Sequence, residues 1–226
     1  MLRKTTESRE SVTGKLVPAA VESSCRALVV QIQSALPLGR ALMLGVTSAE
    51  RGTGRTTVAL GLAIAVARQL GPTANVLLID ADIENPTLHE RCGITYTAGL
   101  SEVLSGEVAL EDAAVPIAPG VRLLAAGTAP LNAPRQMKEL EEVQFFETLG
   151  EHVDALIVDL PPVQSPGLGT LPPRLIPQFC VVTRAGATRR EELQQAIATL
   201  PADRLAAVLL NAQRQRIPRW IDNLLN

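Results

Sequence analysis

Aromatic, histidine and cysteine residues are scarce in this chain, and each shortage excludes a kind of site. One Trp, one Tyr and three Phe among 226 residues leave almost no stacking platform for single-stranded nucleic acid. The formal net charge of -2 supplies no field for a nucleic acid duplex. Three cysteines without a CxxC pair, and only two histidines, His89 and His152, support neither a structural zinc site nor a disulfide framework. We therefore expect no nucleic acid partner.

Long apolar runs are also missing. The longest, residues 58–67, has ten residues, about half of the roughly 20 that a helix needs to cross a bilayer. The basic residues near the start are not followed by an apolar segment, so this region does not look like a secretion signal. We expect a cytoplasmic protein without a transmembrane segment of its own.

Hydrophobic residues make up 46% of the chain, which is enough to bury the core of one domain of this length. Residues 1–20 are polar and rich in Ser, Thr and charge. That composition predicts a flexible N-terminal arm over residues 1–20 and a single folded domain over residues 21–226.

Apolar patterning within the domain alternates between two kinds of segment. Apolar spacing predicts helices at residues 21–36, 56–70, 133–150 and 189–200. Short, wholly apolar runs predict strands at residues 41–46, 76–79, 121–125, 155–158, 180–183 and 206–210. Such strands, separated by helices, predict an α/β fold with a doubly wound, mostly parallel sheet covered on both faces. The Pro-rich residues 161–177 are predicted to form a long surface loop.

A glycine-rich loop follows the first expected strand. It reads SAERGTGRTT from Ser48 to Thr57 and leads into an apolar helix, which is the context of a phosphate-binding P-loop. The glycines let backbone N–H groups turn toward a phosphate, and the helix directs its positive end to the same place. A simple glycine-rich helix start is the alternative. The residues expected to bind the phosphates are Gly52, Thr53, Gly54, Arg55, Thr56 and Thr57.

Acidic residues end two other expected strands. Asp80 and Asp82 follow one apolar run, and Asp159 follows another. Because ligands of open α/β sheets bind at the carboxyl ends of the strands, these acids are expected to converge on the glycine loop. Thr56, Asp82 and Asp159 would then hold Mg²⁺, and Asp80 would orient or deprotonate a nucleophile. The alternative is that the acids only cap helices or form turns.

The motifs together resemble a known family. The segments TSAERGTGRTT, LLIDADIENPTLH, GLSEVLSGE, LLAAGTAPLNAP, ALIVDLPP and VLLNAQ are similar to those of the bacterial tyrosine kinases (BY-kinases) of capsule and exopolysaccharide assembly. These kinases belong to the deviant Walker A branch of P-loop NTPases, with the septum-site and partitioning ATPases. The likeness runs over most of residues 22–215.

The resemblance implies a function and its participants. It implies ATP and Mg²⁺ as cofactors, phosphotransfer to protein tyrosine with Arg55 on the phosphates and Asp80 as base, and contact of Asn211 with the adenine. It also implies a partner, the cytoplasmic tail of a membrane chain-length regulator of polysaccharide export, which would bring the chain to the inner face of the plasma membrane. A homo-oligomer is implied as well.

Departures from the family pattern predict weak or lost catalysis. Arg55 replaces the P-loop lysine with a larger, forked group, and Glu84 replaces an arginine. No tyrosine follows Tyr96, so the family's C-terminal tyrosine cluster is missing. These changes leave open a non-catalytic pseudokinase scaffold for the membrane regulator.

Two further departures concern assembly and the choice of subgroup. Glu50 stands where partitioning ATPases carry their signature lysine, which disfavours a third hypothesis, a partitioning-type localisation ATPase. Glu22, Arg26 and Leu28 match the family's ExxRxLR oligomer motif only in part, because Val29 replaces its second arginine. Ring formation is therefore disfavoured.

Overall fold

The described strands form one twisted sheet. The computed structural model describes residues 16–35, 41–95, 98–127, 145–165 and 176–212. Within them the sheet has the order β3-β4-β2-β5-β1-β6-β7, and all neighbours are parallel except β3 and β4. The strands are β1 Leu42–Ser48, β2 Val76–Asp80, β3 Val115–Ala118, β4 Val121–Leu124, β5 Ala155–Asp159, β6 Gln178–Arg184 and β7 Leu205–Asn211. The doubly wound, mostly parallel sheet predicted from the sequence is confirmed.

All six expected strands are present, and β3 is the one that the sequence did not predict. It is a four-residue edge strand that contains Pro116 and pairs antiparallel with β4, with a register shift between Pro116 and Ala118. Proline cannot donate a backbone hydrogen bond, so it is tolerated at such an edge but hides the strand from an apolar pattern.

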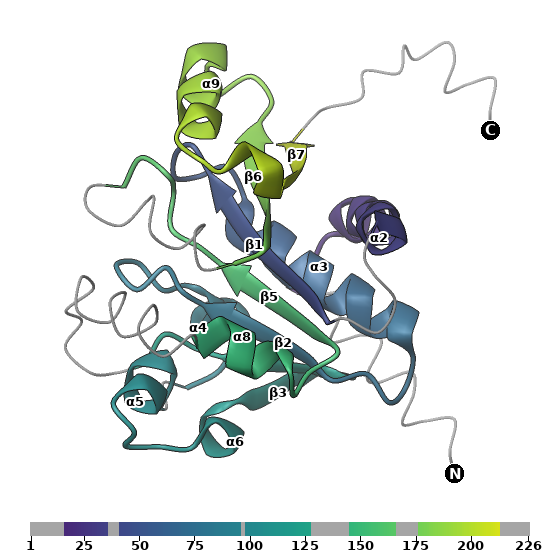
Figure 1. Ribbon diagram of the computed structural model, residues 1–226, viewed down its shortest axis with the longest axis vertical. Coiled ribbons are helices and arrows are strands. Elements are labelled where there is room, and N and C mark those ends of the chain that lie inside the picture. The colour runs from purple at the N-terminus through teal and green to yellow at the C-terminus, as the bar shows by residue number, and fades with distance from the viewer. Residues whose placement is uncertain (1–15, 36–40, 96–97, 128–144, 166–175, 213–226) are drawn as a thin grey trace.

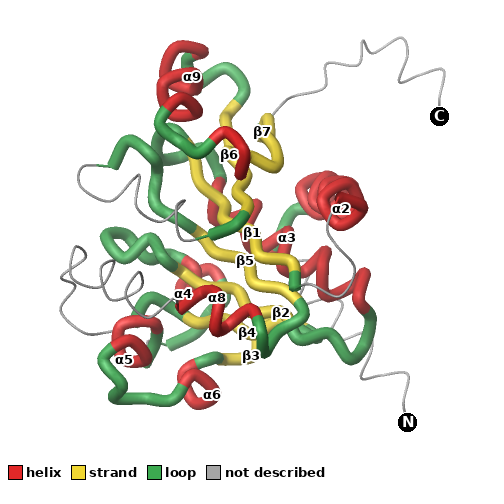
Figure 2. Tube along the Cα trace, in the orientation of Figure 1, coloured by secondary structure: helices red, strands yellow, loops and turns green. Residues whose placement is uncertain are grey.

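Helices cover both faces of the sheet (Figures 1 and 2). The longer helices coincide with predicted ones, although residues 133–144 of the expected helix 133–150 lie outside the described residues. The short helices span too few residues to show a periodic pattern. Residues 161–165 and 176–177 of the expected loop contain neither helix nor strand. The helices are α2 Ala19–Ala35, α3 Arg55–Leu70, α4 Leu88–Arg91, α5 Leu100–Leu104, α6 Leu110–Ala113, α8 Phe145–Gly150, α9 Arg190–Ala198 and the 3₁₀ helix η2 Ala202–Arg204.

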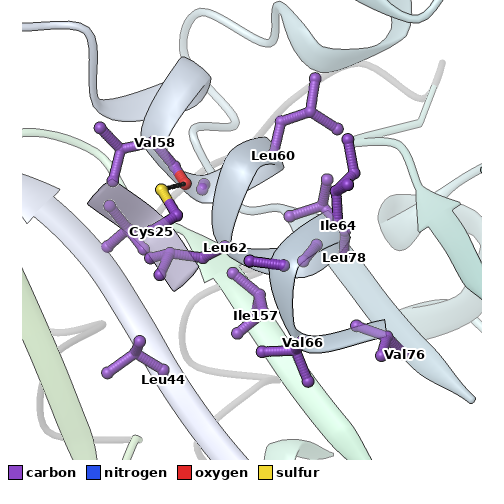
Figure 3. Packing of buried hydrophobic residues seen from close by; sticks show 14 of the residues in the cluster. Cys25, Leu44, Val58, Leu60, Leu62, Ile64, Val66, Val76, Leu78 and Ile157 are labelled. Carbon is purple, nitrogen blue, oxygen red and sulfur yellow. Dashed lines mark hydrogen bonds between the residues drawn. The ribbon is translucent and has the colours of Figure 1, made fainter. Parts of the chain in front are cut away.

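The core lies on the two faces of the central strands, of which β2 and β5 are wholly buried and β1 is buried except for the partly exposed Met43. Alternate residues of a strand point to opposite faces, so Leu44, Leu78 and Ile157 pack in the cluster that contains α3 (Figure 3). Their neighbours Leu77, Ile79 and Leu156 belong to the cluster on the α8 side. Helix α3 is buried from Val58 to Ala67, because it lies between the sheet and α2. The packing of α3 on the sheet holds its first residues close to the end of β1.

Helix α2 packs against α3 and crosses it (Figure 1). Gly61 permits the close approach, since a Cβ there would lie 3.0 Å from Cys25 Sγ and 3.4 Å from Val17 Cγ1. Glu22 and Arg68 form an ion pair across the two helices. Val17 is only 2% exposed, so the described end of the expected arm packs in the core through an apolar side chain. Residues 1–15 lie outside the described residues.

Among the described helices, none combines the length and the apolar character required to span a membrane.

Candidate phosphate-binding site

The glycine-rich loop joins the end of β1 to the start of α3. Strand β1 lies between β5 and β6, the type of position at which open α/β sheets bind ligands. Gly52 and Gly54 have φ angles of 79° and 89°, in the left-handed region that favours glycine. The amide of Asn211, at the end of β7, donates from Nδ2 to the Thr53 carbonyl oxygen at 2.8 Å. A Cβ on Gly54 would collide with this amide, so the loop and Asn211 fit each other closely.

A cavity of about 180 Å³, hereafter the cradle, opens at this loop. Five of the six loop residues predicted to bind phosphates line it, and the N-terminus of the 16-residue helix α3 begins there. The sixth, Thr57, instead accepts a hydrogen bond at its Oγ1 from Arg91 Nη1 at 3.0 Å. Backbone N–H groups at a helix start favour an anion. The cradle is lined by Arg51, Gly52, Thr53, Gly54, Arg55, Thr56, Asp82, Asn85, Thr87 and Arg91.

Arg55 lies between two buried acids beside the cradle. Its Nη2 is 2.5 Å from Asp82 Oδ2, and its Nε is 3.0 Å from Asp159 Oδ1. Its Nη1 donates to Ser48 Oγ at 3.4 Å. Asp82 is 2% exposed and Asp159 1%. Arg55 therefore supplies countercharge to both buried carboxylates, and Asp82 also pairs with Arg51. The convergence of strand ends that the sequence predicts is confirmed for these two acids.

Burial dominates the electrostatics of the acids. Desolvation raises the pKa of Asp159, while the charge of Arg55 and a hydrogen bond from the Thr56 side chain oppose the rise. Asp80 is fully buried and accepts backbone hydrogen bonds at its Oδ2 from Thr87 and Leu88, at 3.1 and 3.0 Å. Its burial, together with the nearby charge of Asp159, raises its pKa to about 8. Asp80 does not line the cradle.

The residues predicted to hold Mg²⁺ do come together, but Arg55 lies among them. The Thr56 side chain hydrogen-bonds to Asp159, and Asp82 faces the cradle. Asp82 Oδ2 already contacts two guanidinium groups, and within the described residues its Oδ1 is buried without a partner. Because Arg55 contacts a carboxylate oxygen of each acid, these residues as arranged do not fit a Mg²⁺ ion bridging Asp82 and Asp159.

Two arginines beside the loop, Arg51 and Arg91, were not predicted from the sequence as site residues. For residues 184–190 the sequence favoured a solvated helix start over a contact with phosphate or a partner. Arg51 pairs with Asp82 at 3.2 Å and with Glu84 at 3.3 Å, so the charge of Glu84 is offset locally. Arg91 lines the cradle, and Arg184 Nη1 donates to the Gly52 carbonyl oxygen at 3.1 Å.

The comparison with family models gave no match, but curated proteins match along most of the chain. The tyrosine-protein kinase YwqD of Bacillus subtilis strain 168 is 30% identical over 173 residues, which cover 73% of this chain and 70% of YwqD. The tyrosine-protein kinase ptk of Acinetobacter johnsonii is 26% identical over 77% of this chain. That alignment spans only 24% of the Acinetobacter kinase.

Solved structures agree with these matches. The kinase domain of the Escherichia coli tyrosine kinase ETK is similar with a TM-score of 0.78 and 25% identity, over 86% of this chain and 76% of that one. The fold alone is shared with a cobyrinic acid a,c-diamide synthase of Mycobacterium smegmatis, which holds an ATP analogue and magnesium. Its TM-score is 0.62 at 24% identity, over 82% of this chain and 80% of the synthase. This chain belongs to the bacterial tyrosine-protein kinase family and has its P-loop nucleotide-binding fold.

Proposed function

We propose that this chain binds ATP in the cradle and acts in the biosynthesis and export of bacterial capsule or exopolysaccharide, with weak or lost transfer of phosphate to protein tyrosine. The observation that carries nucleotide binding is the glycine loop itself. Its two left-handed glycines lie at the start of α3, where N–H groups and the helix dipole together favour a phosphate. Membership of the tyrosine kinase family supports the biological setting.

Residue roles follow from the positions around the loop. Residues 52–56, which line the cradle, are proposed to surround the phosphates, with the charge of Arg55 close to them. Thr57, predicted to bind phosphate as well, would contribute only from the side of Arg91. Asn211 lies next to Gly54 and is proposed to contact the adenine. Asp80 is proposed as the base for a protein hydroxyl, and its pKa of about 8 is near the working pH, which suits a proton acceptor. Because Asp80 is buried beneath Thr87 and Leu88, transfer requires that segment to move.

Weak transfer follows from the partners of Arg55. In active relatives a lysine would present a compact charge to the phosphates, whereas the planar guanidinium of Arg55 forms ion pairs with Asp82 and Asp159. A guanidinium that is paired with these carboxylates stabilises less of the negative charge that develops on the phosphates during transfer. The same ion pairs favour the second candidate, a pseudokinase scaffold that binds its partner without catalysis.

The proposed partner is the cytoplasmic tail of a membrane chain-length regulator, which would bring the chain to the inner face of the plasma membrane. A homo-oligomer is also proposed, on family grounds. Glu22, part of the incomplete oligomer motif, pairs with Arg68 of its own chain. An assembly that uses Glu22 would therefore have to share or replace that ion pair.

Calorimetric titration with ATP in the presence of Mg²⁺ tests the nucleotide site. Transfer of radiolabel from ATP to the separately expressed tail of the regulator tests the chemistry. We expect ATP binding, with transfer that is slow in the native chain and faster in Arg55→Lys. A folded native chain that fails to bind ATP would leave only the scaffold. Rapid transfer by the native chain would contradict the proposed weakness.

A further inference from the structure

The side chain of Arg55 makes more contacts within the protein than a residue whose only role is to contact phosphate would require. Each of its three side-chain nitrogens has a partner, namely Asp159, Ser48 and Asp82. The residue is 8% exposed, so these are contacts in a low-dielectric surrounding, where charge-assisted hydrogen bonds are strong. Arg55 therefore has a structural partner set before any ligand arrives.

The two carboxylates need a cation to remain buried and charged. Burying Asp82 and Asp159 without countercharge is costly, and in a site that used Mg²⁺ a divalent ion between them would supply that charge. Here the guanidinium spans the two, with one nitrogen on an oxygen of each acid. Arg51 adds a second positive group on Asp82 Oδ2. The cationic position between the acids is thus taken by a side chain of the protein.

A lysine at position 55 would hold the acids differently. Its three N–H donors share one compact nitrogen, whereas the rigid fork of arginine presents a separate nitrogen to each carboxylate and to the hydroxyl. A Mg²⁺ ion bridging the acids would first have to displace Arg55 from two charged hydrogen bonds. The substitution of arginine for the lysine of the motif therefore changes what the acids bind, as well as the group that faces the phosphates.

We infer that Arg55 replaces the divalent cation between Asp82 and Asp159, so that the cradle binds the phosphates of ATP without Mg²⁺. This inference rests on the proposed ATP site. The phosphates would contact the backbone N–H groups at the start of α3 and the arginines that line the cradle, Arg51 and Arg91. Arg51 has a side chain that is 46% exposed, so it can turn from Glu84 toward an anion.

The test is the dissociation constant for ATP, measured by calorimetry on the full chain in excess EDTA and again in excess Mg²⁺. For the native chain we expect the two constants to agree within about twofold, whereas Arg55→Lys should bind more tightly with Mg²⁺ by about tenfold or more. Arg68→Lys is the matched control, because it makes the same exchange on α3 at a surface ion pair. In Arg68→Lys, as in the native chain, the dissociation constants for ATP with and without Mg²⁺ should agree.

The outcomes separate the inference from the function on which it rests. Native binding that requires Mg²⁺ overturns the inference and leaves the ATP site standing. Binding by Arg55→Lys but not by the native chain, in either buffer, overturns the inference and leaves a scaffold that has lost its nucleotide. Absence of binding in every folded variant overturns the ATP site itself. The native comparison needs no substitution, so it remains decisive even if Arg55→Lys does not fold.

Discussion

Asn211 at the end of β7 holds the carbonyl oxygen of Thr53 in the glycine loop, 158 positions earlier in the chain, through a 2.8 Å hydrogen bond. The loop that contacts phosphate is thus supported by a strand from the far end of the domain. Asn211 is therefore expected to support the shape of the loop as well as to contact a bound nucleotide.

Replacing Asn211 with Ala should weaken ATP binding by about tenfold. The loop would lose the hydrogen bond to the Thr53 carbonyl oxygen, and the adenine would lose its proposed contact. Calorimetric titration measures the change. Asn75→Ala is the control. It removes the 2.9 Å hydrogen bond from Nδ2 to the His152 carbonyl oxygen and the 3.1 Å hydrogen bond from Arg122 Nη2 to Oδ1, and costs about 2 kcal/mol of stability. Unchanged ATP affinity in Asn211→Ala would remove this residue from the site.

Gly54→Ala should lower the free energy of unfolding by more than the about 1–2 kcal/mol typical of an Ala in the left-handed region. The excess arises because the new Cβ meets the Asn211 amide. Gly106→Ala is matched to it, with a φ of 73° and open space around the Cβ. Urea unfolding of both variants checks the difference. Equal losses of unfolding free energy in the two variants would show that the loop and Asn211 move to accommodate the new Cβ.

Removal of one acid beside Arg55 should be far more harmful than removal of an exposed one. Asp159→Asn leaves Arg55 buried with fewer countercharges, and breaking a buried pair costs about 3–5 kcal/mol. Glu84→Gln removes only the exposed ion pair with Arg51, which is worth at most about 1 kcal/mol. Thermal or urea unfolding distinguishes the two. Similar, small losses in both variants would contradict the ion pairing of Arg55 described above.

Stability should fall in alkaline solution because of the buried thiols. Burial raises the pKa of Cys25 and Cys180 to about 12 and that of Cys92 to about 11, from 9.0. In the unfolded chain these thiols ionise near the ordinary value. Their contribution to stability is therefore full below that pH and is lost as the pH rises from 9 toward 12.

Urea unfolding at about pH 8 and about pH 10.5 measures this loss. The slope with pH should be shallower in Cys25→Ala, which removes one of the titrating groups. The native chain should also react slowly with a thiol reagent at the lower pH, since Cys25 and Cys180 are buried. Rapid labelling of all three thiols in the folded chain would contradict their burial.

The sequence located the loop and the acids because both depend on local pattern. Glycine spacing between a strand and a helix predicted the positions of Gly52 and Gly54, and the shared edge of parallel strands predicted that Asp82 and Asp159 would meet. The ion pairs of Arg55 join residues 27 and 104 positions apart. They depend on how one side chain fits between two strands, which no spacing rule encodes. The burial of Asp80 likewise depends on α4, a helix of four residues.

Both strands that pair with the central strand β1, namely β5 and β6, lie far behind it in the sequence. Leu42 pairs with Ala155 of β5, and Leu44 with Gln178 of β6. Both edges of β1 therefore remain unpaired while residues 49–154 are being synthesised. Unpaired apolar edges are prone to aggregation. The glycine loop can reach its final shape only when the ribosome has released β7. A truncated or stalled chain that ends before β5 therefore exposes both unpaired edges of β1 and has no completed phosphate site.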